Sequence, residues 1–505
     1  MVFRFNTIIR LSLFRCWADR IEEWHLLHPL YAMLCRFLGK FIPAPIKRKW
    51  NSFSHEQQLL LKNIGIGLAI SFFLHIGHTT PWMQGHIRWA MDWTMDMSAG
   101  TQSGSGAGKD IYEKIYAFID IDASQYKAWG EPLFTPRDKL ASLIRGSMAA
   151  GARLIVVDID LTRSSPDPRQ DAVLRDYLAS LGRIPQKERP PIILMKSMCI
   201  GEPRGDALPQ FRDSFLDDVV SRTPGLYWAS PMFYVDDDQI IRYWRMMEYF
   251  TTREGPQVLP SAQLLTYALL MPGEEADSNA YEALRGQLAK IGPADASENV
   301  GNDDDGRRIS LGALTFPLHE KNLENRILYS IKLGMPSPMV ATRNGDQPIF
   351  LCIPSQILFS PDGAQRLRNH LSDRIVIIGG SFAESFDIHN TPLGVMPGAM
   401  IILNSIRSLF TYGIVHEPSW WITVAIEIIL ICIMSISFMV FCSFWGMVIS
   451  GACILFVLVP ISLAVFCHGI WLDFALPLVA VQLHQMADEF EHKREEYNKG
   501  PWRLP

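Results

Sequence analysis

Two apolar runs in the middle of the chain each end in a pair of aspartates. Asp120 and Asp122 close a run that begins at residue 116, and Asp158 and Asp160 close a run that begins at residue 154. Because ligands in open α/β sheets bind beyond the carboxyl ends of parallel strands, these four side chains are candidate binding residues. Grouped carboxylates suit a hard cation such as Ca²⁺ or Mg²⁺, or a cationic ligand. The alternative interpretation is that they only cap the following loops and helix N-termini.

A second group of candidates follows a later apolar run. Gly379, Gly380 and Ser381 come directly after it, and glycines at such a position allow close approach of a ligand or an anion. The stretch matches neither a dinucleotide-binding motif nor a P-loop, and a tight turn without a ligand is the alternative. Asp387 and His389 are spaced either to pair as carboxylate and imidazole, or to form a structural turn in which Asp387 accepts backbone N–H groups.

These residues need an α/β framework to position them. A helical apolar period over 137–151 separates the expected strands 116–122 and 154–160, and this order is typical of parallel pairing. Further expected elements are a strand at 192–195, a hairpin of 226–235 with 239–246, a strand at 374–380 and a helix at 398–411. The predicted fold class is therefore a mixed α/β domain with a partly parallel sheet and flanking helices, attached to a helical membrane region.

Two stretches are expected to lie outside this framework. Residues 98–109 are rich in glycine and serine, which predicts a flexible linker. Residues 272–308 are acidic and contain few large apolar side chains, which predicts a partly disordered surface insertion.

Four apolar stretches are long enough to cross a bilayer, which takes roughly 20 helical residues. The predicted spans are 59–77, 420–442, 445–467 and 470–487. The flanking segments 1–58 and 488–505 are rich in Lys and Arg, which indicates that both are cytoplasmic. Residues 1–58 mix these cations with apolar residues, which favours either a basic amphipathic helix on the inner leaflet or a helix packed on protein. Residues 78–418 are then extracytoplasmic.

Several motifs in this outer region resemble the CHASE2 family of extracytoplasmic sensory domains in bacterial membrane receptors. The matching stretches are FIDIDASQYKAWGEP (118–132), TPRDKLASLI (135–144), AAGARLIVVDIDLT (149–162), RIVIIGGSFAESFDIHNTPLG (374–394) and MPGAMIILNSIRSLF (396–410). The resemblance covers roughly residues 78–415 and implies a sensory domain of a bacterial inner (plasma) membrane protein, in receptors that are commonly dimers. Family members usually continue into a kinase or cyclase domain, whereas this sequence is expected to be a stand-alone form without one.

A few polar groups stand out in the membrane region. Glu427 lies well inside the second predicted span, where an ionisable group suggests function by default. Together with His468 and Asp473 it could form a proton-responsive cluster, or it could simply be hydrogen-bonded to a neighbouring helix. In the outer domain, Cys199 and Cys352 are expected either to form one disulfide or to remain two unpaired thiols.

Other function classes are disfavoured by composition and motif. The formal net charge of −5 gives no indication of nucleic-acid binding. The sequence contains no hydrolase motif of the G-x-S-x-G or H-E-x-x-H type. We therefore predict no catalytic residues, no cofactor, no dedicated metal site and no enzymatic activity.

The leading hypothesis is a membrane sensor or scaffold subunit. Its outer domain would bind a ligand or a protein, and its helices would pass a shift to a separate cytoplasmic or membrane partner, with the protein itself an oligomer. The alternative is a structural accessory subunit of a multi-protein envelope complex, for secretion or polysaccharide export, with the outer domain as a docking surface. A transporter is a third hypothesis, although four helices leave little room for a pore.

Overall fold

The computed structural model describes most of the chain. The described residues are 52–499, with gaps at 79, 100–113, 200–209, 212, 253–254, 272–277, 291–307, 313, 318–320, 322, 343–344 and 442. The chain forms two compact units, one made of residues 1–76, 425–452 and 479–505 and the other of residues 77–424 and 453–478. The second unit contains the α/β domain, which we call the body.

The body is centred on a six-stranded parallel sheet. Its strands, in spatial order, are β15 (Phe350–Pro354), β1 (Ile115–Ile121), β16 (Arg374–Gly380), β2 (Leu154–Asp160), β3 (Ile192–Met195) and β6 (Leu226–Ala229). Residues of β1, β2, β3 and β16 are almost all buried, as expected for parallel strands that helices cover on both faces. The predicted strands at 116–122, 154–160, 192–195 and 374–380 are therefore confirmed to within one residue at each end.

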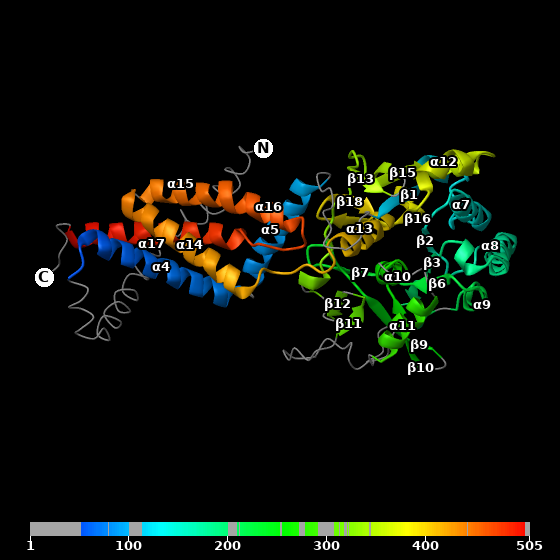
Figure 1. Cartoon of the computed structure of the whole chain (residues 1–505), viewed down its shortest axis with the longest axis horizontal. Helices are drawn as coiled ribbons and strands as arrows, with labels where there is room; N and C mark the ends of the chain where they lie inside the picture. The colour runs from blue at the N-terminus through cyan, green and yellow to red at the C-terminus, as the bar shows by residue number, and fades with distance from the viewer. Residues whose placement is uncertain are drawn as a thin grey trace. The chain divides into compact units, whose positions relative to one another are not determined.

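Helices cover both faces of this sheet (Figure 1). One face packs against α7 (Arg137–Ala149), α8 (Pro168–Ser180), α9 (Asp217–Arg222) and α12 (Gly363–Leu371). The opposite face packs against α10 (Ala262–Leu269) and α13 (Gly398–Thr411), which also contact each other. Both α10 and α13 are buried along most of their length, because they lie between the sheet and other parts of the body.

Smaller elements complete the body. Three of them are helices: α5 (Pro81–Ser98), α6 (Ala123–Ala128) and α11 (Ser278–Ala289). A second sheet contains, in spatial order, β10 (Gly255–Pro260), β9 (Met247–Thr252), β5 (Gln210–Phe211) and β4 (Met198–Cys199). The remaining strands pair as the hairpins β7–β8 (Phe233–Val235, Ile241–Trp244), β11–β12 (Arg308–Leu311, Leu314–Pro317), β13–β14 (Met339–Thr342, Gly345–Pro348) and β17–β18 (Ile388–Thr391, Gly394–Pro397).

Three sequence-based expectations change at this level. The predicted hairpin of 226–235 with 239–246 is shorter, because Leu226–Ala229 instead forms β6 at the edge of the main sheet. The predicted insertion 272–308 contains the helix α11, whose Leu284 and Leu288 are buried. Most of the predicted linker 98–109 lies outside the described residues, and Ser98 is the last residue of α5.

Within the described residues, three helices are long and apolar enough to cross a membrane: His55–Gly77, Trp420–Val440 and Trp445–Phe466. The first two are α4 and α14, and the third runs through α15 (Ser443–Cys453), a π-helical segment (Ile454–Leu458) and α16 (Val459–Phe466). Pro460 lies just after that π segment, where its missing N–H interrupts the regular hydrogen bonding.

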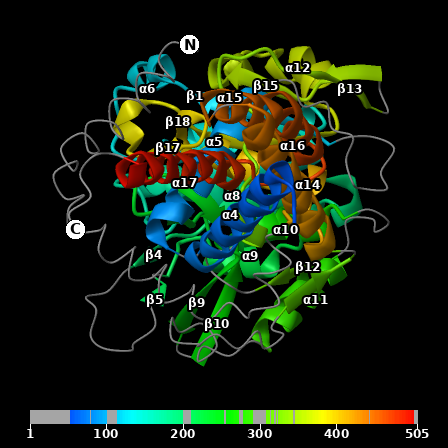
Figure 2. The ribbon, with the colours of Figure 1, turned by 90° about the vertical axis from the view of Figure 1, so that its left-hand side faces the viewer.

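The fourth predicted span, 470–487, overlaps α17 (Ala475–Lys499). Figures 1 and 2 show α17 beside α4 and α14, and within this unit Nε2 of His484 donates a hydrogen bond to the backbone oxygen of Asn63, 3.2 Å away. The ring of His484 also stacks on Phe438 of α14, with 4.5 Å between the ring centres. The predicted amphipathic segment 1–58 lies outside the described residues up to residue 51, and α4 begins at His55.

Candidate functional site

Two carboxylates lie at the carboxyl end of the main sheet, on the face covered by α13. Asp120 of β1 is level with Gly379 of β16, and Asp158 of β2 flanks the same glycine from the other side. Because neighbouring strands are about 4.8 Å apart, the Cα atoms of Asp120 and Asp158 are separated by roughly 10 Å. The structure therefore brings these two predicted residues to one edge of the sheet, with a glycine between them.

Gly379 lets the start of α13 approach this edge closely. A Cβ atom added to Gly379 would lie 2.7 Å from the Cβ of Ala399 and 3.5 Å from the Cβ of Asp158. No larger residue fits there without moving α13. What approaches Gly379 is therefore a helix of the same chain, and the close approach of a ligand or an anion stays a prediction.

Asp387 and His389 belong to the same edge. The Nε2 atom of His389 is 3.0 Å from Oδ1 of Asp387, so the expected carboxylate–imidazole pair forms. The Asp387 carboxylate lies against Gly398, the first residue of α13, because a Cβ added to Gly398 would be 2.4 Å from both carboxylate oxygens.

The electrostatics of the two strand-end aspartates are unfavourable to their charged forms. Burial, together with the nearby Asp387 carboxylate, raises the pKa of Asp158 well above its usual value. Burial also raises the pKa of Asp120, although a hydrogen bond with the Ser381 side chain partly opposes this. One oxygen of each, Oδ1 of Asp120 and Oδ2 of Asp158, is shielded from solvent and has no hydrogen-bond partner among the described residues. We call Asp120, Asp158, Gly379, Asp387 and His389 the strand-end site.

The other two predicted aspartates, Asp122 and Asp160, accept hydrogen bonds from nearby backbone N–H groups. Asp122 caps α6, with its Oδ1 accepting the backbone N–H of Gln125 at 2.7 Å. Asp160 accepts the backbone N–H of Thr162 at 2.8 Å, and the pairing of β2 with β3 is irregular between Val157 and Asp160. That irregularity breaks the alternation that would have put Asp160 on the same face as Asp158. For these two residues the capping interpretation is confirmed.

Gly380 and Ser381 complete the loop after β16. A Cβ on Gly380 would meet the ring of Phe382 at 2.7 Å, and that ring stacks on Tyr126. The backbone N–H of Ser381 donates to the oxygen of Ile121, which fixes the loop against the end of β1. These contacts account for Gly380 by packing within the chain, and they place Ser381 beside Asp120.

Of the two possibilities for Cys199 and Cys352, one disulfide or two unpaired thiols, the structure favours the second. Cys352 is a free cysteine on β15, at the edge of the main sheet, whereas Cys199 lies on β4 of a separate small sheet. Burial and the nearby carboxylates of Asp120 and Asp122 raise the pKa of the Cys352 thiol to about 11. The thiolate form of this exposed side chain is therefore disfavoured at neutral pH.

In the membrane region, Glu427 has partners on α4. The Ser71 hydroxyl donates to its Oε2 at 3.1 Å, and Nδ1 of His75 lies 3.8 Å from its Oε1. These contacts match the expectation of a Glu427 hydrogen-bonded to a neighbouring helix. Asp473 precedes α17, where its Oδ1 accepts the backbone N–H of Ala475 at 2.8 Å. His468 lies in the turn just after α16, with its backbone N–H donating to the backbone oxygen of Val465. A proton-responsive cluster of these residues stays a prediction.

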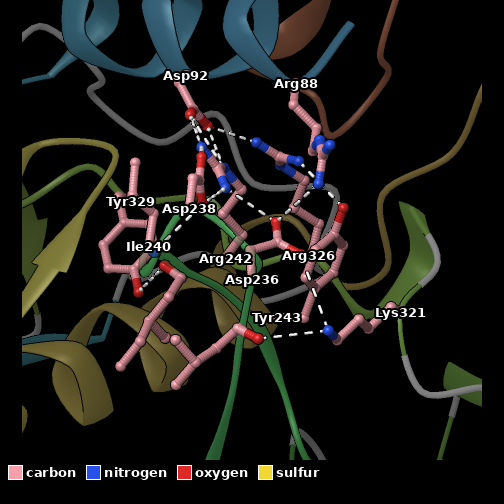
Figure 3. A network of polar contacts seen from close by, with 12 residues as sticks. Arg88, Asp92, Asp236, Asp238, Ile240, Arg242, Tyr243, Lys321, Arg326 and Tyr329 are labelled. Carbon is pink, nitrogen blue, oxygen red and sulfur yellow. Dashed lines mark hydrogen bonds and ion pairs between the residues drawn. The ribbon is translucent and has the colours of Figure 1, made fainter. Parts of the chain in front are cut away.

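A second group of charged residues, which the sequence did not reveal, ties α5 to the rest of the body (Figure 3). Arg242 of β8 donates to Asp92 of α5 at 2.8 Å, to Asp236 at 2.9 Å and to Asp238 at 2.7 Å. Arg326 also donates to Asp92. We call these five residues the α5 joint. Arg88 of α5 and Lys321 extend it, since each is within 4.0 Å of an Asp236 oxygen.

The α5 joint pairs three carboxylates with two guanidinium groups, and both guanidinium groups are buried. The side chains of Arg242 and Arg326 are 4% and 3% exposed, so their bonds are largely shielded from water. The hydrogen bond to Arg242 lowers the pKa of Asp238. Burial alone would lower the pKa of Arg242, but its bonds with Asp238 and Asp92 raise it instead. In the sequence, the acidic residues 236–238 indicate only the loop of the predicted hairpin.

The segment after Arg326 connects the joint with α13. Asn404 of α13 accepts the backbone N–H groups of Ser330 and Ile331 at 3.0 and 2.9 Å. The Ser408 hydroxyl accepts the N–H of Leu328 at 3.0 Å. The helix that begins at the strand-end site is thereby bonded to the segment that continues from the α5 joint.

The fold and these groups define a protein with an α/β body, an acidic strand-end site and helices able to cross a membrane. Residues 66–441 match the family model of the CHASE2 domain, which is most of the chain, and the protein belongs to the CHASE2 family. CHASE2 domains are sensory and extracytoplasmic, and they are not a catalytic family. The comparisons with curated proteins and with solved structures found no match.

Three or more His, Cys, Asp or Glu side chains able to hold a metal ion do not come together anywhere in the described parts of the chain. The geometry therefore gives no support to the hard-cation interpretation of the strand-end aspartates.

Proposed function

We propose that this protein is a membrane-anchored sensor whose body binds a small cationic molecule at the strand-end site. A bound cation would favour the ionised form of Asp158 beside the Asp387 carboxylate and change how α13 rests on the sheet. The shift would pass through α13 and α5 to the membrane helices, and from them to a separate partner protein.

One observation carries this proposal: α13 both covers the strand-end site and leads to a candidate membrane span. Its first residue, Gly398, touches the Asp387 carboxylate, and α14 begins nine residues after α13 ends at Thr411. A second route leads through the hydrogen bonds of Asn404 and Ser408 to the segment of Arg326, and so to Asp92 on α5. The α5 helix itself follows α4 after three residues.

The sensor proposal requires the body to lie outside the cytoplasm. The proposed topology has both chain ends in the cytoplasm and the body on the outer side of a bacterial plasma membrane. Leu133 offers a site to test this, because it belongs to the body and is 89% exposed. In a variant without reactive native cysteines, Leu133→Cys should react with a membrane-impermeant maleimide in intact cells whose outer layers admit the reagent.

A matched control places the cysteine in the C-terminal segment instead, at Asn498. That position should be labelled only after the plasma membrane is permeabilised. Labelling of Leu133→Cys only after permeabilisation would show that the body is cytoplasmic, and the sensor proposal would then be wrong.

The separate partner is tested by purification in native-like lipid particles. The full chain should retain a second protein through mild detergent or polymer extraction, and removal of residues 488–505 or of residues 1–50 should release it. Retention of no partner, or of the same proteins by both truncated chains, would contradict the proposal of a partner docked on a terminal segment.

A further inference from the structure

Helix α5 has two unlike faces. One is buried in the body through Met83, Ala90, Met91, Thr94 and Met95, and it also supplies Asp92 to the α5 joint. The other carries large aromatic side chains that are open to the surroundings: Trp82 is 57% exposed and Trp89 is 49% exposed. Residues seven apart lie on the same side of a helix, so these two indoles share one face.

The start of α5 is held close to the end of a candidate membrane span. The backbone N–H of Thr80 donates to the oxygen of Gly77, the last residue of α4, and the Thr80 hydroxyl bonds to the same oxygen. A turn closed in this way keeps its ends within about 7 Å of each other. The side-chain amide of Gln84 also donates to the backbone oxygen of His78, 2.9 Å away. Trp82 therefore lies close to the end of α4, and these hydrogen bonds hold the connection between the two helices.

The other span that leads out of the body carries the same kind of residue at its corresponding end. The helix α14 begins with Trp420 and Trp421, which are 61% and 73% exposed. Indole rings concentrate at membrane–water interfaces, because they present an apolar ring and a polar N–H together. On the proposed topology, the end of α4 and the start of α14 both lie at the outer surface of the bilayer, so Trp82 falls at the level of that aromatic belt.

We propose that α5 is an interfacial helix, with its Trp82 and Trp89 face inserted among the lipid headgroups on the outer surface of the membrane. The α5 joint then holds the body to a helix that is itself seated on the bilayer. His86 supports this seating, because its ring packs on the Trp82 ring at 4.4 Å and its Nδ1 bonds to the Trp82 backbone oxygen at 2.9 Å. The inference does not depend on which ligand the strand-end site binds.

The test uses the full-length protein in vesicles of phosphatidylcholine and phosphatidylglycerol, with a fraction of the phosphatidylcholine brominated near the headgroup end of its chains. Bromine quenches indoles at that depth. The wild-type chain should lose clearly more tryptophan fluorescence than the variant Trp82→Phe with Trp89→Phe, because two quenchable indoles have been removed. A matched control is Trp129→Phe, which removes a partly buried indole that packs on Phe359 of the body. Its remaining fluorescence should be quenched by a larger fraction than that of the double variant.

A second measurement identifies what covers the face if lipid does not. Nitroxide labels at Trp82→Cys and Trp89→Cys should collide more often with oxygen, which partitions into lipid, than with a water-soluble nickel chelate, whereas a label at Leu133→Cys should show the reverse. Labels at 82 and 89 that meet nickel as readily as the label at 133 would place the face in water. Labels that meet neither would place it against protein, such as a second copy of this chain. Either result, or equal bromine quenching of the wild type and the double variant, would overturn the proposal.

Discussion

The strand-end site and the α5 joint are both built from aspartates in the body, but the two groups are satisfied very differently. In the α5 joint, Asp92, Asp236 and Asp238 all bond to the guanidinium of Arg242. In the strand-end site, Asp158 faces another carboxylate, that of Asp387. A closed network of this kind fixes two elements together, whereas acids that lack partners leave room for a ligand that brings a positive charge.

The two groups also differ in the parts of the chain that they contact. The Asp387 carboxylate lies against Gly398, the first residue of α13, so a ligand there could move the helix while breaking few interactions. The joint instead connects side chains from α5, from the hairpin β7–β8 and from the Arg326 segment (Figure 3). We infer that the strand-end site is where the state of the body changes, and that the α5 joint transmits the change without itself opening.

The largest predicted effect is on the joint. Arg242→Ala would leave three buried or partly buried aspartates without their shared donor, and removing one partner of a buried ion pair typically costs about 3–5 kcal/mol. We expect the free energy of unfolding of the body to fall by about that amount, measured by chemical denaturation of the full chain in lipid nanodiscs.

The matched control for this variant is Arg308→Ala. Arg308 pairs with Glu324 on the surface, and exposed pairs contribute roughly 0–1 kcal/mol. Equal stability losses in the two variants would show that the joint is no more than another surface ion pair.

A smaller effect is expected at the contact between α13 and Asp387. A Cβ at position 398 would lie 2.4 Å from both Asp387 oxygens, so Gly398→Ala must displace the carboxylate or the start of the helix. Overpacking of this kind costs about 1–3 kcal/mol. Gly286→Ala in α11 is the control, because a Cβ there meets nothing within 4 Å and the helix should gain up to about 1 kcal/mol. Stability changes of the same sign in both variants would be evidence against a tight contact at Gly398.

A smaller expected difference between the strand-end site and the α5 joint is the pH dependence of the free energy of unfolding. In the unfolded chain an aspartate loses its proton near pH 4, whereas Asp158 in the folded body keeps its proton to a higher pH. The folded state therefore binds more protons than the unfolded state above about pH 4, and the free energy of unfolding falls as pH rises until the raised pKa is passed.

The variant Asp158→Asn should lack this decline, so its stability relative to the wild type should improve by up to about 1.4 kcal/mol per pH unit within that window. Denaturation at a series of pH values measures the difference. Parallel pH profiles for the two proteins would show that Asp158 titrates normally.

The sequence was sufficient to predict the central strands and the edge at which the candidate residues gather. Runs such as Leu154–Asp160 are so rich in β-branched residues that only a buried strand accommodates them, and the acids that follow must then lie at its carboxyl end. The spacing of Asp387 and His389 allowed either a carboxylate–imidazole pair or a structural turn, and only the structure shows the pair.

The sequence could not show that Asp158 belongs to the strand-end site and Asp160 does not. The difference arises from the irregular pairing of β2 with β3, which depends on tertiary contacts. It also missed the α5 joint, since Asp92 and Arg242 are 150 residues apart and neither belongs to a local motif. The position of β6 was misjudged for a related reason. Leu226–Ala229 is apolar enough for a hairpin or a sheet edge, and only the tertiary fold decides between them.

The most direct test of the strand-end site is the binding of small organic cations to the full chain in nanodiscs. The probes are putrescine, spermidine, choline and arginine, and the readout is the shift of the unfolding midpoint with probe concentration. We predict that at least one of them stabilises the wild type and Asp160→Asn alike, but shows at least tenfold weaker apparent affinity for Asp158→Asn. Stabilisation by none of the four, or equal stabilisation of all three proteins, would contradict the account.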